Sequence, residues 1–259
     1  MDFGITGRVA MVAAASKGIG LATARALAAE GCQISICGRN EETLEAAAES
    51  ISPDTRSYVV DVTQAEDLAW WHEQTVADLG PVDILVTNTG GPPAGAPGSL
   101  TDEQWQLGVD STLLNIERLS RLVIPTMRER KWGRVVHITS LVAKEPNRLL
   151  TISSTLRAGI MALTRLQGAE FGPDGVTVNG VLPGHTLTDR QLHLADIRSK
   201  EQGISPEAVL AQTALEIPLR RLADASEIAA AVAFLCSQPA GYINGVSLLV
   251  DGGLTKGMA

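Results

Sequence analysis

Short apolar stretches alternate with Ala-rich amphipathic stretches along nearly the whole chain. The apolar stretches are four to eight residues long and rich in Val and Ile, as in buried strands, whereas the intervening ones have helical spacing. This pattern predicts strands at residues 8–13, 33–37, 56–60, 82–87, 134–139, 176–181 and 246–250. Helices are predicted at 20–30, 41–50, 65–79, 151–171 and 226–237, with a long helix from Thr101 that ends before Gly133 and an irregular segment after residue 181.

Repeated strand–helix–strand order predicts an α/β fold with right-handed crossovers. We expect residues 1–259 to form one domain, a Rossmann-type doubly wound parallel sheet of about seven strands with helices on both faces, because no composition break or linker divides the chain. Ligands of such sheets bind beyond the carboxyl ends of the strands, near the point where the strand order reverses. Chemically important residues should therefore follow strands directly.

Composition narrows the possible partners. Hydrophobic residues make up 45% of the chain and the net charge is −8, which argues against a nucleic-acid partner because a phosphate backbone requires a basic face. No apolar run approaches the roughly 20 residues of a membrane span, so no membrane partner is expected. Cys32, Cys37 and Cys236 lack metal-ligand spacing. We expect buried thiols, no metal site and a reducing cytoplasmic location.

The turn after the first predicted strand, Ala13 to Gly20, leads directly into a helix. Gly18 and Gly20 would let backbone N–H groups approach a diphosphate at the positive end of that helix. An ordinary strand-to-helix turn would explain the glycines equally well. The second predicted strand ends in Gly38-Arg39-Asn40 and lacks the acid that usually binds the ribose 2′-hydroxyl of NAD. Arg39 and Lys17 instead favour the 2′-phosphate of NADP(H), unless Arg39 is merely a solvated surface residue.

With these motifs, the chain resembles the short-chain dehydrogenase/reductase family over almost its whole length, and in particular reductases of the β-ketoacyl-carrier-protein type. Gly18-Ile19-Gly20 resembles the end of the family's TGxxxGxG loop, and Val250-Asp251-Gly252-Gly253 resembles its C-terminal signature. The resemblance implies a cofactor site that comprises Ala14, Ser16, Lys17, Gly18, Ile19, Gly20, Arg39, Asn40, Asp61, Val62, Asn88, Thr89, Gly90, Arg157, Pro183, Gly184 and Thr186.

The family's catalytic Ser, Tyr, Lys and Asn fall here on Ser140, Ser153, Arg157 and Thr112. The resemblance thus implies a divergent member that retains only the serine. An aliphatic hydroxyl has a pKa far above that of a phenol, and Arg157 cannot release a proton in practice. The alternatives are that His185 or water supplies the proton and that Asn115, one helical turn beyond Thr112, replaces the missing amide.

The leading hypothesis is an NADP(H)-dependent oxidoreductase that acts on the carbonyl/alcohol pair of a small-molecule substrate. In it, Ser140 polarises the substrate oxygen and Arg157 binds the ribose or an acidic substrate. The alternative is a cofactor-binding sensor or assembly protein without hydride transfer. The family also implies a homo-oligomer, a tetramer or a dimer, built through the helices that start near Thr101 and Thr151. Residues 187–217 occupy the place of the family's substrate lid, and we expect a mobile cover there.

Overall fold

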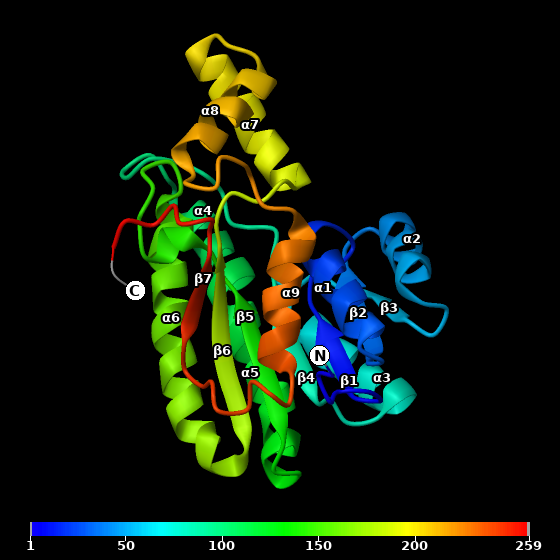
Figure 1. Ribbon diagram of the computed structural model, residues 1–259. Helices are drawn as coiled ribbons and strands as arrows, with labels where there is room; N and C mark the ends of the chain where they lie inside the picture. Colours follow the sequence, from blue (N-terminus) through cyan, green and yellow to red (C-terminus); the bar gives the residue numbers. More distant parts are fainter. Residues whose placement is uncertain (1, 258–259) are drawn as a thin grey trace.

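The computed structural model describes residues 2–257 and contains a seven-stranded parallel sheet with helices on both faces (Figure 1). The strand order is β3-β2-β1-β4-β5-β6-β7. The predicted Rossmann-type fold is therefore confirmed, and each predicted strand lies within a few residues of an observed one. The strands are β1 (Val9–Val12), β2 (Gln33–Gly38), β3 (Arg56–Val59), β4 (Ile84–Thr87), β5 (Gly133–Ile138), β6 (Val176–Pro183) and β7 (Ser247–Val250).

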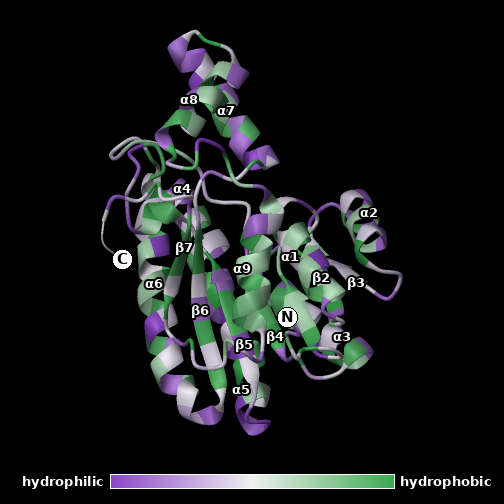
Figure 2. Cartoon of the chain, viewed as in Figure 1, coloured by the Kyte–Doolittle hydropathy of each residue, from purple (hydrophilic) through white to green (hydrophobic). Residues whose placement is uncertain are grey.

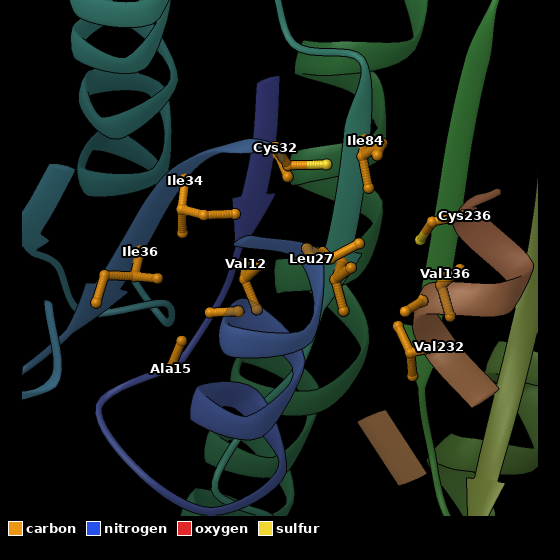
Figure 3. Close-up of a cluster of buried hydrophobic side chains, with 14 of the residues drawn as sticks. Val12, Ala15, Leu27, Cys32, Ile34, Ile36, Ile84, Val136, Val232 and Cys236 are labelled. Carbon is orange, nitrogen blue, oxygen red and sulfur yellow. The ribbon is translucent and has the colours of Figure 1, made fainter. Parts of the chain in front are cut away.

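Alternating strand residues feed two separate apolar cores, one on each face of the sheet. In β1, Ala10 and Val12 pack on the face covered by helices α1 (Gly18–Ala29), α2 (Glu41–Ile51) and α9 (Ala225–Cys236). Val9 and Met11 pack on the face covered by α3 (Ala65–Leu79), α5 (Asn115–Glu129) and α6 (Thr151–Phe171). The first core includes both buried cysteines shown in Figure 3, and the green centre of Figure 2 marks the same apolar interior. Both faces of the sheet are thus buried, as parallel sheets require.

The helix predicted from Thr101 is interrupted. Its start is as expected, because Thr101 and Gln104 form a capping box at the beginning of α4 (Asp102–Gly108). A π-helical turn at Val109–Leu114 then separates α4 from α5. Wide turns of this kind often occur at functional positions, and this one contains Thr112.

The segment after β6 is not irregular, which corrects the prediction for the chain that follows residue 181. It forms two helices, α7 (Asp189–Gln202) and α8 (Pro206–Glu216). Thr188 caps α7, Gly203 ends it with a left-handed φ of 68°, and Ser205 caps α8, which has Pro206 in its first turn. The sequence contained these capping signals, but the polar composition of α7 concealed its helical pattern.

The carboxyl ends of all the strands point to one edge of the sheet, and α7 and α8 project beyond that edge (Figure 1). The strand order reverses between β1 and β4, which are adjacent although two strands separate them in sequence. Most of the predicted site residues follow β1, β2, β3, β4, β5 or β6 at this edge, and the others lie on the π-helical turn and α6. The fold therefore collects them where open α/β sheets bind ligands.

Candidate functional site

The amino-terminal end of α1 lacks a protein cap. Its N-cap residue, Lys17, makes no side-chain capping hydrogen bond, and no acidic residue lies in the first turn. By contrast, α2, α4, α7, α8 and α9 all have side-chain caps. In the described part of the chain, the N–H groups of Gly18, Ile19 and Gly20 have no hydrogen-bond acceptor. These donors, together with the helix dipole, fit an anionic diphosphate.

Three backbone segments meet tightly behind these donors. The Asn88 amide, which follows β4, donates to the carbonyl oxygen of Ala14 over 3.1 Å. A Cβ on Gly20 would lie 2.5 Å from that carbonyl oxygen and 2.8 Å from Asn88 Nδ2. Glycine at position 20 is therefore a steric requirement. Ala14 itself has a φ of 48°, a left-handed conformation that costs an L-residue about 1 kcal/mol or more.

The residues predicted to select the 2′-phosphate lie at the carboxyl end of β2. Arg39 is exposed, and in residues 2–257 it has no ion-pair or hydrogen-bond partner. Asn40 caps α2 by accepting from the Thr43 N–H over 2.9 Å, so its side chain has a structural role at this position. Lys17 forms an exposed ion pair with Asp189 at the start of α7 over 2.9 Å. Ser16 contacts the end of β2, where a Cβ on Gly38 would lie 3.3 Å from Ser16 Cβ.

The remaining predicted cofactor residues lie along the same edge. Asp61 accepts hydrogen bonds from the N–H and hydroxyl of Thr63, so its carboxylate is held in a turn beside half-buried Val62. Thr89 and Gly90 continue from Asn88 after β4. Pro183 ends β6, and the following Gly184 packs so closely on Asp251 that a Cβ would lie 2.7 Å from its Cα. Thr186 is buried, and its hydroxyl donates to the Gly184 carbonyl oxygen.

Ser153 and Arg157 form a buried pair on α6. Arg157 Nε donates to Ser153 Oγ over 3.1 Å, and Arg157 Nη1 donates to the carbonyl oxygen of Ile138 at the end of β5, also over 3.1 Å. Arg157 is 6% exposed and Ser153 is 8% exposed. Burial, and then the guanidinium of Arg190, lower the pKa of Arg157 to about 10, so Arg157 remains a cation at neutral pH. The pair thus connects α6 to the strand that precedes Ser140.

Ser140 caps the short turn Leu141–Ala143 that packs on α6. Its hydroxyl accepts from the Val142 N–H over 3.3 Å. Ser153 likewise accepts from Arg157, so each hydroxyl oxygen is held by a fixed donor. Among residues 2–257 neither O–H has a hydrogen-bond acceptor, so each can still donate.

Thr112 and Asn115 are both fully buried. Asn115 Oδ1 accepts from the Ile116 N–H, while Asn115 Nδ2 and the Thr112 hydroxyl lack partners in the described structure. Buried polar atoms of this kind are usually satisfied by water. The structure does not bring either residue into hydrogen-bond contact with Ser140 or Ser153.

His185 contacts α7 through Gln191. Its Nδ1 lies 3.4 Å from Gln191 Oε1, and burial lowers its pKa below the ordinary value, although the Gln191 hydrogen bond and Glu216 oppose this shift. The neutral imidazole therefore dominates at pH 7. Neither of the chain's two tyrosines hydrogen-bonds to Ser153: Tyr58 donates to Asp78 on α3, and the side chain of Tyr242 is fully exposed.

Sequence reasoning missed Arg190. This residue on α7 is half-buried, and its Nη2 donates to the carbonyl oxygen of Pro92 in the loop after β4 over 3.3 Å. Burial lowers its pKa, and its charge in turn lowers that of Arg157. The missed signal was the capping sequence of α7, which would have indicated a helix whose first turn carries Arg190.

Comparisons with known proteins agree with this geometry. Residues 13–255 match the family model described as enoyl-(acyl carrier protein) reductase. The chain is 35% identical to 2,3-dihydro-2,3-dihydroxybenzoate dehydrogenase from Bacillus subtilis over 259 residues, covering 98% of each chain. It is 34% identical to a 3-oxoacyl-(acyl-carrier-protein) reductase from Escherichia coli over 248 residues, covering 96% of this chain and 97% of the relative.

Solved structures give the same result. The structure of L-sorbose reductase from Gluconobacter frateurii, complexed with NADPH and L-sorbose, aligns over 100% of both chains with a TM-score of 0.94 and 32% identity. A single-substitution variant of actinorhodin polyketide ketoreductase with NADPH aligns over 96% of this chain and 98% of its own, with a TM-score of 0.93 and 31% identity. The chain therefore belongs to the short-chain dehydrogenase/reductase family. No helix among the described residues is long and apolar enough to cross a membrane.

Proposed function

We propose that this protein is an NADP(H)-dependent oxidoreductase that interconverts a carbonyl compound and its alcohol. The observation that carries the proposal is the pair of hydroxyl groups, Ser140 and Ser153, each with its oxygen held by a fixed donor and its hydrogen free to donate. The names of the family relatives, which include ketoreductases and structures with NADPH, support the same reaction class. The member is divergent, because Ser153 and Arg157 stand where the family has Tyr and Lys.

Bound NADPH would supply the hydride that reduces the carbonyl carbon. Negative charge then develops on the carbonyl oxygen, and preorganised hydrogen-bond donors aimed at that charge lower the barrier. Ser140 and Ser153 are the donors, and the Arg157 cation strengthens the Ser153 hydroxyl as a donor. Among residues 2–257, Arg157 is also the one titratable side chain that hydrogen-bonds to Ser153, and it retains its proton. The proton for the alcohol therefore comes from water rather than from a side-chain acid, and we place His185 outside this step.

The dinucleotide would bind across the carboxyl edge of the sheet. The uncapped N–H groups of Gly18, Ile19 and Gly20 would hold its diphosphate, and exposed Arg39 would bind the 2′-phosphate with Lys17 close by. Lys17 would exchange its surface ion pair with Asp189 for that phosphate, a small loss because exposed ion pairs contribute little. The unpartnered amide of Asn115 near Thr112 is suited to hold a water molecule.

Three further features complete the proposal. Residues 1–259 act as one domain in which α7 and α8, within 187–217, cover the substrate.

The protein forms a homotetramer or dimer through the helices that begin at residues 102 and 151, and sedimentation velocity tests this state. Buried, unpaired Cys32, Cys37 and Cys236 support a reducing, cytoplasmic location.

The test is turnover. NADPH absorbance is followed with a panel of aldehydes, ketones and β-ketothioesters, first with the unchanged protein and then with Ser140→Ala. We expect Ser140→Ala to lower kcat by about a hundredfold, the usual loss for one donor to a developing oxyanion. Ser57→Ala on β3 is the control and should retain full activity. NADPH binding without turnover on any carbonyl would instead support a cofactor-binding sensor.

A further inference from the structure

Two arginines near the proposed reaction site lack acidic partners. Arg157 is 6% exposed and Arg190 is half-buried. Within residues 2–257, neither guanidinium has a carboxylate oxygen within 4.0 Å. Their recorded hydrogen bonds go to neutral acceptors, the Ser153 hydroxyl and the carbonyl oxygens of Ile138 and Pro92. Both cations are therefore desolvated without a counter-charge.

The loop after β4 connects Arg190 to α6, the helix that carries Ser153. Arg190 Nη2 donates to the Pro92 carbonyl oxygen, and a Cβ on Gly91 would lie 3.7 Å from the same nitrogen. This loop is fastened to the start of α6, because the Gly95 N–H donates to the Leu149 carbonyl oxygen and the Thr151 hydroxyl donates to the Gly95 carbonyl oxygen. Arg190 thus contacts the loop that is fastened to the start of α6, and its charge acts on Arg157.

An isolated buried cation costs several kcal/mol unless an anion or enough dipoles compensate it. The nearest acid in sequence, Asp189, is engaged with Lys17 and does not serve Arg190. The chain is acidic, with 29 Asp and Glu residues against 21 Lys and Arg, so acidic residues are plentiful elsewhere. Two cations without acidic partners in an acidic protein fit a ligand that brings the negative charge itself, and guanidinium groups match the oxygens of carboxylates and phosphates.

We propose that the substrate is a carbonyl compound that carries an anionic group, a carboxylate or a phosphate, which Arg190 binds directly and Arg157 attracts electrostatically. This proposal rests on the proposed reductase function for the reaction and adds the class of substrate. In it, α7 does not merely cover the site but contributes the residue that recognises the anion.

The experiment compares anionic ketones with neutral counterparts of the same skeleton. The pairs are levulinate with methyl levulinate, acetoacetate with ethyl acetoacetate, and dihydroxyacetone phosphate with dihydroxyacetone. The value of kcat/KM is measured for each with NADPH, and binding of each to the NADP⁺-loaded protein is measured by calorimetry in low-salt buffer. Both readouts are repeated with Arg190→Met and with Lys200→Met, which removes an exposed positive charge from the last turn of the same helix.

At least one anionic compound should exceed its neutral counterpart by about tenfold or more in kcat/KM and in affinity, equivalent to one good charged contact. Arg190→Met should bring this ratio close to one, mainly through KM, and Lys200→Met should leave it unchanged. The levulinate and phosphate pairs distinguish the two anion types. Equal values within every pair, or a ratio that Arg190→Met does not change, overturn the proposal. Anion-selective, Arg190-dependent binding without turnover would support the anion site and reject the reductase function.

Discussion

Arg157 Nε donates a hydrogen bond to the hydroxyl oxygen of Ser153, one helical turn earlier on α6, over 3.1 Å. The bond orients a hydroxyl that we expect at the position of the family's phenol, and it places a buried positive charge next to that hydroxyl. In the proposed mechanism, this pair stabilises charge on the substrate oxygen without titrating near neutral pH. The predictions below follow from this arrangement and from the loop that would hold the dinucleotide.

Replacing Ser153 by Ala removes one of the two free hydroxyl donors. We expect Ser153→Ala to lower kcat by about a hundredfold while KM changes little, because the lost hydrogen bond strengthens as charge develops on the carbonyl oxygen. Ser153→Thr keeps the hydroxyl and should retain most of the activity. Steady-state kinetics with NADPH measure both, and equal losses in the two variants would contradict a role for the hydroxyl.

Restoring the family's residue pair should improve catalysis. In Ser153→Tyr with Arg157→Lys, a phenol beside an ammonium group can both donate a hydrogen bond and transfer a proton, which the serine cannot do. We expect kcat to rise by about tenfold or more, within the usual contribution of general acid catalysis. Circular dichroism and NADPH binding serve as controls for folding. A folded double variant that binds NADPH without any gain would refute this explanation of the divergent site.

The tight contact at Gly20 should make that position intolerant. A Cβ there would lie 2.5 Å from the Ala14 carbonyl oxygen, so Gly20→Ala must displace the first loop, and NADPH affinity should fall by about a hundredfold. Gly159→Ala on α6 is the matched control, because no atom lies within 4 Å of the added Cβ. It should leave NADPH affinity unchanged, because Gly159 lies outside the proposed nucleotide site. Calorimetry measures both affinities, and unchanged NADPH binding by Gly20→Ala would contradict the loop geometry.

Arg39 should set the preference for NADPH over NADH. Arg39→Gln removes a charge-assisted contact worth about 1.5–3 kcal/mol, so NADPH affinity should fall by about ten- to a hundredfold while NADH affinity stays constant. Arg56→Gln removes another exposed arginine, from β3, and should change neither affinity. Fluorescence titration compares the variants. An equal loss for both nucleotides, or none, would remove Arg39 from the phosphate site.

A buried histidine should make stability depend on pH. His137 lies between the Thr87 hydroxyl and the Gln167 side-chain oxygen, at 2.8 and 3.0 Å, and burial lowers its pKa to about 4. Below pH 6.5 the unfolded chain binds a proton that the folded protein does not, so stability falls as the pH decreases from about 6.5 to 4, by up to about 3 kcal/mol. Urea unfolding gives the free energy of unfolding of the unchanged protein and of His137→Gln at several pH values. The difference between the two slopes of free energy against pH measures this contribution. Identical pH dependence of the two proteins would contradict it.

The sheet and most helices could be predicted from the sequence, because their apolar patterns and capping residues lie within the elements themselves. The capping box at Thr101 and Gln104 and the bounds of α3 and α6 are of this kind. The π-helical turn was not predictable, because it depends on how Thr112 and its neighbours pack against α6. The helices α7 and α8 were missed because solvent-exposed polar residues obscure the helical period, although their caps were present.

In the candidate site, too, some features could be predicted from the sequence and others depend on tertiary contacts. The glycines and the residues that follow each strand were predictable, because a motif fixes their place at the edge of the sheet. The contact of Arg190 with the loop after β4 was not, because 98 residues separate Arg190 from Pro92. The free hydroxyls of Ser140 and Ser153 also required knowledge of which donor occupies each oxygen.

The central claim is that the uncapped start of α1 and the cation at the end of β2 bind NADPH. Isothermal titration of the purified protein with NADPH and, separately, with NADH tests it most directly. We predict a one-to-one complex with NADPH in the micromolar range or tighter and binding of NADH that is at least about tenfold weaker. Absence of heat with both nucleotides, or tighter binding of NADH, would contradict the account.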